Sequence, residues 1–153
     1  DEDSKFLLEY VIAHETAHQW WYSIVGNDEV SEPWLDEALT EYSTILYFES
    51  RYGEDVSDKL MKTMKVQSEN YRGEDMFKAI NEFGSSSEYS LNVYTKGAVV
   101  FNEIRKEVGD KIFFETLQEY CQSYMFQNVN GEQFMKLWKD KGVDINKIVD
   151  KCN

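Results

Sequence analysis

The sequence predicts an all-α, mainly helical fold, and three observations support this prediction. Apolar residues recur three and four positions apart through most of the chain, which is the period of an amphipathic helix. No run of residues shows the alternation of apolar and polar side chains that is typical of a half-buried strand. One proline and eight glycines among 153 residues are a mix that fits a compact, helix-rich protein.

Three helices are expected in the N-terminal half of the chain. The first has an apolar face that begins with Leu8, Val11 and Ile12. Pro33 suits the first turn of the second helix, because the amide hydrogen that proline lacks has no partner there, and Gly53 is expected to end that helix. The predicted ranges are about 6–25 for the first helix, 33–53 for the second and 55–71 for the third, which is more polar.

The C-terminal half is expected to start with a loop and continue with helices. Residues 73–92 include a Gly-Ser-Ser-Ser run and are predicted to be mostly loop, with a short helical turn near 77–83. Helical periodicity returns at Val93, and Gly109 is expected to end that helix. No internal repeat or linker divides the chain, so residues 1–153 are expected to form a single helical domain. The last helices are each predicted to follow a residue that can cap the first turn: Asp110, Asn130 and Asp144.

The charge balance and the apolar content exclude several classes of protein. Lys and Arg number 16 and Asp and Glu number 29, so the net charge is −13 and the chain would repel the phosphates of a nucleic acid. No apolar run approaches the roughly 18 residues of a membrane-spanning segment. Cys121 and Cys152 are too few for a disulfide framework and are expected to be small core residues. The chain starts at Asp1 rather than Met, which we interpret as a mature product or a piece of a longer protein, and the compartment stays undetermined.

The two histidines of the chain, His14 and His18, lie in the pentad His-Glu-Thr-Ala-His. Positions i and i+4 of a helix differ by about 40° after one full turn, so both imidazoles project from one face and can share a cation. Glu15 lies beside them and completes the H-E-x-x-H arrangement of zinc hydrolases, in which the glutamate flanks the metal without having to bind it. The alternative interpretation is a surface or half-buried helix that happens to carry two histidines.

A third protein ligand is needed, because zinc prefers four ligands and a catalytic site keeps one position for water. With no further histidine, this ligand must be a carboxylate or a thiolate, and Glu37 is the best candidate. It lies 19 residues after His18, close to the apolar face of the next predicted helix, where an unpaired carboxylate is costly. The segment 26–33 is long enough to fold that helix back onto the first. The alternative is a solvated acid, as most carboxylates on helices are.

Glu41 is a candidate partner for a metal-bound histidine, because ligating imidazoles usually donate their other N–H to an acceptor. It lies one turn beyond Glu37 on the same face and could accept a hydrogen bond from His14 or His18. Asp36 is a weaker candidate, since it points about 100° away. An exposed position for Glu41 is an equally good interpretation of the sequence.

These motifs together resemble the aminopeptidase N family of gluzincin zinc metallopeptidases, which includes leukotriene hydrolase. H-E-T-A-H-Q-W at 14–20 is followed by W-L-D-E at 34–37, and Y-T-K-G-A at 94–98 is similar to a third segment of the family. The resemblance extends to about Val108. The site residues that it implies are three ligands of one zinc ion per chain, a general base and a transition-state stabiliser: His14, His18 and Glu37, then Glu15, then Tyr94.

The chemistry of these side chains fits the roles that the resemblance implies. Zinc held by two neutral imidazoles and one carboxylate lowers the pKa of a bound water toward about 7. Glu15 can take the proton and later deliver it to the leaving amine. Tyr94 could donate a hydrogen bond to the oxyanion that forms on the scissile carbonyl. Without the resemblance, Tyr94 would be interpreted as an ordinary half-buried tyrosine.

One motif of the family is absent from this sequence, the Gly-x-Met-Glu-Asn segment whose glutamate binds the free amine of the substrate. We therefore expect the helical C-terminal half of a zincin-like (thermolysin-like) catalytic domain, with a peptide as substrate and a β-rich lobe of the parent chain as the other wall of the cleft. The expected reaction is hydrolysis of peptide bonds at peptide N-termini, with little activity from this chain alone. The alternative is a non-catalytic zinc-binding or interaction domain that keeps the same helices.

Overall fold

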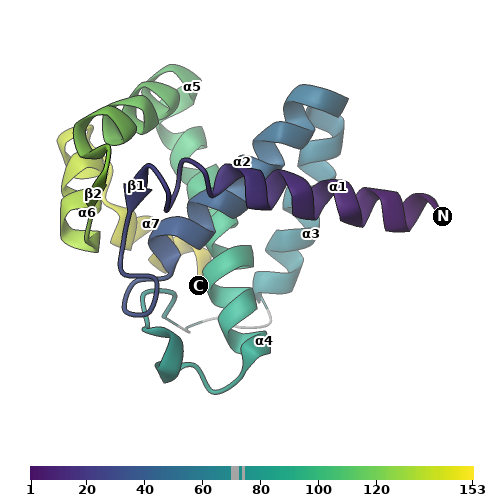
Figure 1. Ribbon diagram of the computed structural model, residues 1–153, viewed down its shortest axis with the longest axis horizontal. Coiled ribbons are helices and arrows are strands. Elements are labelled where there is room, and N and C mark those ends of the chain that lie inside the picture. Colours follow the sequence, from purple (N-terminus) through teal and green to yellow (C-terminus); the bar gives the residue numbers. More distant parts are fainter. Residues whose placement is uncertain (70–72, 74) are drawn as a thin grey trace.

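The computed structural model describes residues 1–69, 73 and 75–153 and is mainly helical, as the sequence predicts (Figure 1). Its α-helices are α1 Glu2–Ala17, α2 Trp34–Tyr52, α3 Glu54–Ser68, α4 Ser86–Tyr89, α5 Gly97–Tyr124, α6 Gly131–Asp140 and α7 Ile145–Cys152. The structure also has a 3-10 helix η2 Ile80–Glu82, a π-helix η3 Ser90–Lys96, and the strands β1 Val25–Gly26 and β2 Gln127–Asn128. Among the described residues, no helix is both long enough and apolar enough to cross a membrane.

The second helix, α2, lies at the centre of the hydrophobic core. It packs against α1, α3, η3 and α5, and Figure 1 shows α1 lying across it. Pro33 directly precedes α2, and Gly53 ends it with a φ of 94° that favours glycine. The sequence places apolar residues of this helix at helical spacing. Leu46 is partly buried and the others are buried: Leu35, Ala38, Leu39, Tyr42 and Ile45.

The first helix ends earlier than the sequence predicts. It covers Glu2–Ala17 rather than residues 6–25. Beyond it the chain turns, and Tyr22 adopts a φ of 116°, which lies outside the helical range. Val25 then joins a strand instead of continuing the helix. Residues 20–25 are apolar and aromatic enough to continue a helical pattern. Pairing with the distant segment 127–128 determines their backbone conformation instead.

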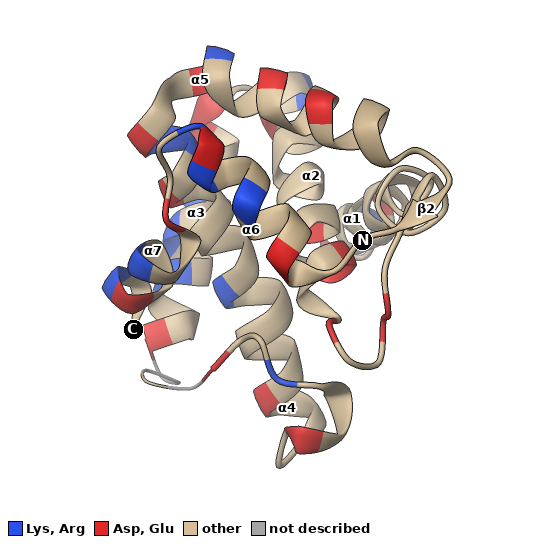
Figure 2. Cartoon of the chain, turned by 90° about the vertical axis from the view of Figure 1, so that its left-hand side faces the viewer, with Lys and Arg blue, Asp and Glu red and all other residues tan. Residues whose placement is uncertain are grey.

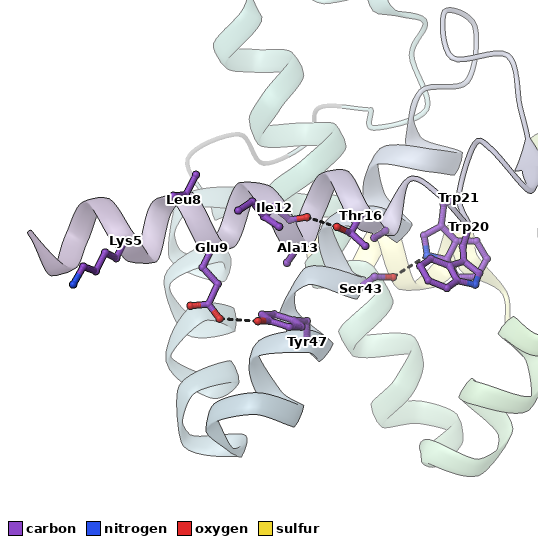
Figure 3. Close-up of a pocket in the computed structure, with 11 residues that line it drawn as sticks. Lys5, Leu8, Glu9, Ile12, Ala13, Thr16, Trp20, Trp21, Ser43 and Tyr47 are labelled. Carbon is purple, nitrogen blue, oxygen red and sulfur yellow. Dashed lines mark hydrogen bonds between the residues drawn. The ribbon is translucent and has the colours of Figure 1, made fainter.

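The side chains that begin the predicted apolar face of α1 are exposed. Leu8, Val11 and Ile12 are 61%, 45% and 56% exposed, and no residue of α1, all of which the structure describes, is buried. The Phe6 and Tyr10 rings attach this helix to Phe48 of α2, and hydrogen bonds also join the two helices. One of them is the hydrogen bond from the Tyr47 hydroxyl to Glu9 at 2.7 Å (Figure 3).

A parallel pairing of two residues joins β1 to β2, and the sequence does not predict it. Val25 pairs with Gln127, and Gly26 pairs with Asn128. A Cβ on Gly26 would lie 2.3 Å from the side-chain oxygen of Asn128, so a larger residue there would displace that side chain. A strand this short shows no alternating pattern, so periodicity cannot reveal it. The pairing anchors the connection between α1 and α2 to the segment that follows α5.

The stretch predicted as mostly loop, residues 73–92, is more helical than expected. The predicted turn near 77–83 is confirmed as η2, but α4 follows it and η3 leads directly into α5. Ser85 caps α4, since its hydroxyl accepts a hydrogen bond from the Glu88 amide. Serines suit loops and helix caps equally well, which explains the error. Residues 70–71, where the third helix is predicted to end, lie outside the described residues.

Most of the helix ends and helix starts predicted for the C-terminal half are present in the structure. Gly109 has a φ of 79° and interrupts the helical geometry of α5, with Asp110 directly after the bend. Asn130 caps α6 as predicted, because its side chain accepts a hydrogen bond from the Gln133 amide at 3.0 Å. Asp144 occupies the N-cap position of α7 without a capping hydrogen bond from its side chain.

Candidate metal centre

Three side chains from two helices meet where α1 lies across α2. His14 and His18 project from the C-terminal end of α1, and Glu37 lies in the first turn of α2. The Nε2 atoms of both imidazoles lie 3.3 Å from the same oxygen, Oε2 of Glu37. Helical spacing puts the two rings on one face of α1, and the connection through β1 brings α2 back across them.

The distances fit a tetrahedral metal ion. One ligand atom from each of His14, His18 and Glu37 lies within 4.8 Å of the other two. Zinc bonds of about 2.0–2.1 Å in a tetrahedral site place neighbouring ligand atoms roughly 3.3 Å apart. That is the separation between each imidazole and the carboxylate. The side chains of His14, His18 and Glu37 are 12%, 21% and 18% exposed, so the group is largely buried but still reached by water.

The second nitrogen of each imidazole has its own partner. Nδ1 of His14 lies 2.8 Å from Oε2 of Glu41. Nδ1 of His18 lies 3.1 Å from the carbonyl oxygen of Trp21 and 3.2 Å from the hydroxyl of Thr40. Both rings are therefore held through Nδ1, and both present Nε2 toward the third side chain. This is the arrangement that metal-binding histidines commonly have.

The charges of the cluster are strongly coupled. Burial alone would raise the pKa of Glu37, but hydrogen bonds from His14, His18 and Tyr94 outweigh it and lower the pKa to about 2. Burial alone would lower the pKa of His14, but its bonds to Glu37 and Glu41 raise the pKa to about 9. The bond to Glu37 also raises the pKa of His18. The carboxylate is therefore ionised at neutral pH and attracts positive charge to the centre of the cluster.

Tyr94 and Glu15 are far apart in the sequence but border the same pocket. Tyr94 belongs to η3, and its ring stacks on His14 at 5.7 Å with an angle of 13° between the planes. Burial and then the hydrogen bond to Glu37 raise the pKa of Tyr94, so its phenol stays protonated and can donate. Glu15 is exposed. The open pocket has a volume of about 390 Å³, and its lining residues are Tyr10, Val11, His14, Glu15, His18, Glu37, Glu41 and Tyr94.

All the residues predicted for the site therefore border one pocket, and the structure adds others. Asp36 points elsewhere, as expected, and accepts a hydrogen bond from Asn27 at 3.0 Å. Sequence reasoning missed Tyr10, whose hydroxyl donates to Glu41. Its position four residues before His14, on the same helix face, is the signal that could have revealed it. The carbonyl oxygen of Trp21 could not have been found, because a backbone atom leaves no mark in a sequence.

The surroundings of the cluster are acidic. Residues 1–50 contain twelve Asp or Glu and a single basic residue, Lys5. Lys and Arg lie mainly on α3, α5, α6 and α7, away from the contact between α1 and α2 (Figure 2). Residues 1–50 therefore attract cations, within the roughly 8 Å over which physiological salt leaves such attraction effective.

Two imidazoles, a carboxylate and an adjacent glutamate on crossing helices define a candidate hydrolytic metal centre. Comparison with known families makes the assignment specific, because residues 2–152 match the peptidase family M1 domain. The chain belongs to peptidase family M1. This confirms the resemblance to the aminopeptidase N and leukotriene hydrolase family that the sequence motifs indicate.

The curated relatives are aminopeptidases and leukotriene hydrolases. Leukotriene A-4 hydrolase of Xenopus laevis is 30% identical over 158 residues, which cover 94% of this chain and 26% of that protein. Aminopeptidase B of Mus musculus is 29% identical, over 90% of this chain and 24% of its own length. Endoplasmic reticulum aminopeptidase 2 of Bos taurus is 23% identical, over 88% of this chain and 14% of its own length. The chain thus spans 14–26% of the length of these relatives.

Solved structures share the fold. An M1 zinc metallopeptidase mutant of Deinococcus radiodurans, bound to a Tyr-Ser-Ala substrate, superposes with a TM-score of 0.78 at 21% identity, covering 94% of this chain and 32% of that one. Native yeast LTA4 hydrolase gives a TM-score of 0.73 at 21% identity, covering 93% of this chain and 24% of that one. The predicted fold class, the helical part of a zincin-like catalytic domain, is confirmed.

Proposed function

We propose that this chain is the metal-binding helical part of a zinc aminopeptidase, which hydrolyses peptide bonds at the N-termini of peptides. The observation that carries the proposal is the position of one carboxylate oxygen of Glu37, 3.3 Å from the Nε2 atoms of both His14 and His18. Membership of family M1 supports the same class of reaction. We treat residues 1–153 as one helical subdomain of that enzyme.

The residues assigned to the metal are His14, His18 and Glu37, which would hold one zinc ion per chain. Zinc bound there would polarise the scissile carbonyl and make water nucleophilic at neutral pH. Glu41 and the carbonyl of Trp21 hold the two imidazoles from behind, at 2.8 and 3.1 Å. Removal of such a partner typically weakens metal binding by about 10–100-fold.

We assign the proton transfers to Glu15 and the stabilisation of the oxyanion to Tyr94. Glu15 directly follows a proposed ligand and borders the pocket, so it can accept a proton from the attacking water and return it to the leaving amine. The Tyr94 phenol stays protonated and stands over the His14 ring, where it can donate a hydrogen bond to the developing oxyanion. The acidic surroundings favour a substrate with a cationic N-terminus.

The peptide cleft is proposed to be completed by other parts of a longer protein. A groove of about 610 Å³ runs along α1 and is bordered by the α2 residues Ser43 and Tyr47 (Figure 3). Apolar residues such as Leu8, Ile12 and Trp20 also border it. The chain also spans only 14–26% of the length of its curated relatives. We therefore expect a further lobe to cover α1, and little or no hydrolysis from the 153-residue chain alone.

Zinc content and hydrolysis, measured on the longest natural protein that contains this chain, test the proposal. The wild type should hold close to one zinc per chain by elemental analysis and release amino acids from fluorogenic aminoacyl substrates. Glu15→Gln should keep the zinc and lose at least about 100-fold in turnover, because the general base is removed while the ligands remain. Glu2→Gln removes the same charge from the far end of α1 and should change neither property.

Three results distinguish a zinc peptidase from a non-catalytic domain and from a chain without a metal centre. An active Glu15→Gln variant would contradict the proposed mechanism. Zinc binding without hydrolysis by the wild type would favour a non-catalytic zinc-binding domain. A wild type that holds no zinc would contradict the metal centre itself.

A further inference from the structure

A tyrosine hydroxyl stands behind the carboxylate that contacts His14. Glu41 uses one oxygen, Oε2, to accept the hydrogen bond from Nδ1 of His14 at 2.8 Å. Its other oxygen, Oε1, accepts a hydrogen bond from the hydroxyl of Tyr10. Tyr10 lies one helical turn before His14 on α1, while Glu41 belongs to α2. The three side chains therefore close a loop between the two helices, directly behind the proposed metal.

The position of this hydroxyl is set by the hydrophobic core. The Tyr10 ring stacks on Phe48, with a centroid distance of 5.7 Å and an interplanar angle of 29°, and Phe48 is fully buried. A second ring, Phe6, lies 6.2 Å from Tyr10 and 5.0 Å from Phe48, so the three rings form one cluster. Glu41 itself is only 7% exposed. The Tyr10 ring is thus held by aromatic neighbours that do not belong to the metal centre, and the Glu41 carboxylate that it meets is buried.

We propose that Tyr10 is a positioning residue of the metal centre, which acts through Glu41 on His14. The inference rests on the proposed function, since it assumes that His14 binds the metal. A carboxylate that accepts at both oxygens has a fixed plane, so the Nδ1–H of His14 is held in one direction and its Nε2 points at the metal position. His18 has a different support, because its Nδ1 faces a neutral backbone carbonyl, that of Trp21. The two histidines are therefore oriented by different means.

Tyr10→Phe tests this role, because it removes the hydroxyl and keeps the ring against Phe48. Zinc affinity is measured by competition with a chromophoric chelator, and the visible spectrum of the Co²⁺-substituted protein reports the coordination geometry. We expect zinc affinity to fall about three- to tenfold, less than the roughly 10–100-fold expected for Glu41→Gln, which removes the direct partner of the histidine. The Co²⁺ bands should shift or weaken in both variants.

The double variant Tyr10→Phe, Glu41→Gln identifies the route of the effect. If Tyr10 acts through Glu41, the double variant should bind zinc as Glu41→Gln does, within about twofold, because coupled residues are not additive. Tyr47→Phe is the matched control. It removes another tyrosine hydroxyl that links α2 to α1, at 2.7 Å from Glu9 and away from the metal (Figure 3). Its zinc affinity and Co²⁺ spectrum should equal those of the wild type.

The inference is wrong if Tyr10→Phe binds zinc like the wild type. It is equally wrong if, in the double variant, the loss of zinc affinity from Tyr10→Phe adds fully to the loss from Glu41→Gln. It is also wrong if Tyr47→Phe loses as much affinity as Tyr10→Phe, since the hydroxyl would then only dock α1 on α2. These results leave the proposed zinc site intact. A wild type that binds no zinc would overturn the site and this inference together.

Discussion

His14 and His18 share one face of α1, yet their neighbours differ in charge and in origin. His14 faces a carboxylate on a neighbouring helix, Glu41, whereas His18 faces the carbonyl of Trp21, three residues along its own chain. A charged acceptor makes the imidazole more basic than a neutral one does. Individual residues therefore set not only which atoms can bind the metal but also how strongly each is oriented.

Asp36, next to a proposed ligand, illustrates how burial without a cation acts on a single carboxyl. It is 4% exposed, and burial raises its pKa from 3.8 to about 6 despite the hydrogen bond from Asn27. The folded state therefore binds the proton more tightly than the unfolded state. Between about pH 4 and pH 6 the stability contribution of this group is lost as the pH rises, because the native protein must give up that proton.

Asp36→Asn should remove this dependence. In the metal-free chain, the free energy of unfolding of the variant relative to wild type should rise by roughly 2–3 kcal/mol from pH 4 to pH 7. Urea unfolding at several pH values measures it. Asp28→Asn is the control of opposite sign, because the hydrogen bonds from Ser31 and Val30 lower the pKa of Asp28. A difference for Asp36→Asn that does not change with pH would contradict the prediction.

At the scale of elements, the closeness of α2 to the start of α5 places Tyr94 beside Glu37. Gly97 begins α5 and faces Ala38 of α2, and a Cβ on it would lie 2.4 Å from the Ala38 Cβ. The two helices can therefore approach only because one side of the contact has no side chain. Since η3 runs directly into α5, this contact also sets the distance from η3 to the metal centre.

Gly97→Ala should destabilise the protein by about 1–3 kcal/mol through overpacking, although alanine favours a helix over glycine by about 1 kcal/mol. Adding Ala38→Gly restores the space, so the double variant should recover much of the loss, beyond the cost of Ala38→Gly alone. Thermal or urea unfolding of the four proteins measures this coupling. Equal losses for Gly97→Ala in both backgrounds would mean that the contact with Ala38 is not the cause.

At the scale of the whole molecule, α2 lies at the centre of the core, whereas the apolar side of α1 faces outward. The buried side chains include α2, α5, α6 and α7 residues such as Leu39, Phe101, Trp138 and Ile148. Leu8 and Ile12, by contrast, border the groove of about 610 Å³ along α1. Exposed apolar patches of this kind promote association in solution.

The isolated chain should therefore self-associate, and Leu8→Lys with Ile12→Lys should shift it toward monomer in sedimentation velocity over a range of concentrations. The physical reason is that charged side chains in the groove oppose its burial against another molecule. Val66→Lys is the control, since Val66 is 59% exposed on α3, outside the groove. If Val66→Lys disperses the chain equally, the added charge and not the groove is responsible.

The features that the sequence predicts correctly depend on interactions between residues close together in the chain. The positions of the α2 residues Leu35 to Ile45 repeat at the period of a helix, so their burial follows from the sequence. The shared face of His14 and His18 follows from the four-residue spacing alone. Asn130 is a capping residue because its short side chain reaches the Gln133 amide within one turn. These features depend on neighbours in sequence, whose relative positions a helix determines.

Contacts between distant residues needed the tertiary structure. The distance from Glu37 to the imidazoles depends on a connection that β1 anchors to Gln127 and Asn128, more than 100 residues away by number (127 − 25 = 102). The link from Tyr10 to Glu41 joins two helices, and so does the stacking of Tyr94 on His14. Periodicity assigned α1 an apolar side but could not say what covers it. Sequence thus determined the helices and their chemistry, whereas tertiary structure decided which side chains meet, because such meetings depend on how the whole chain folds back on itself.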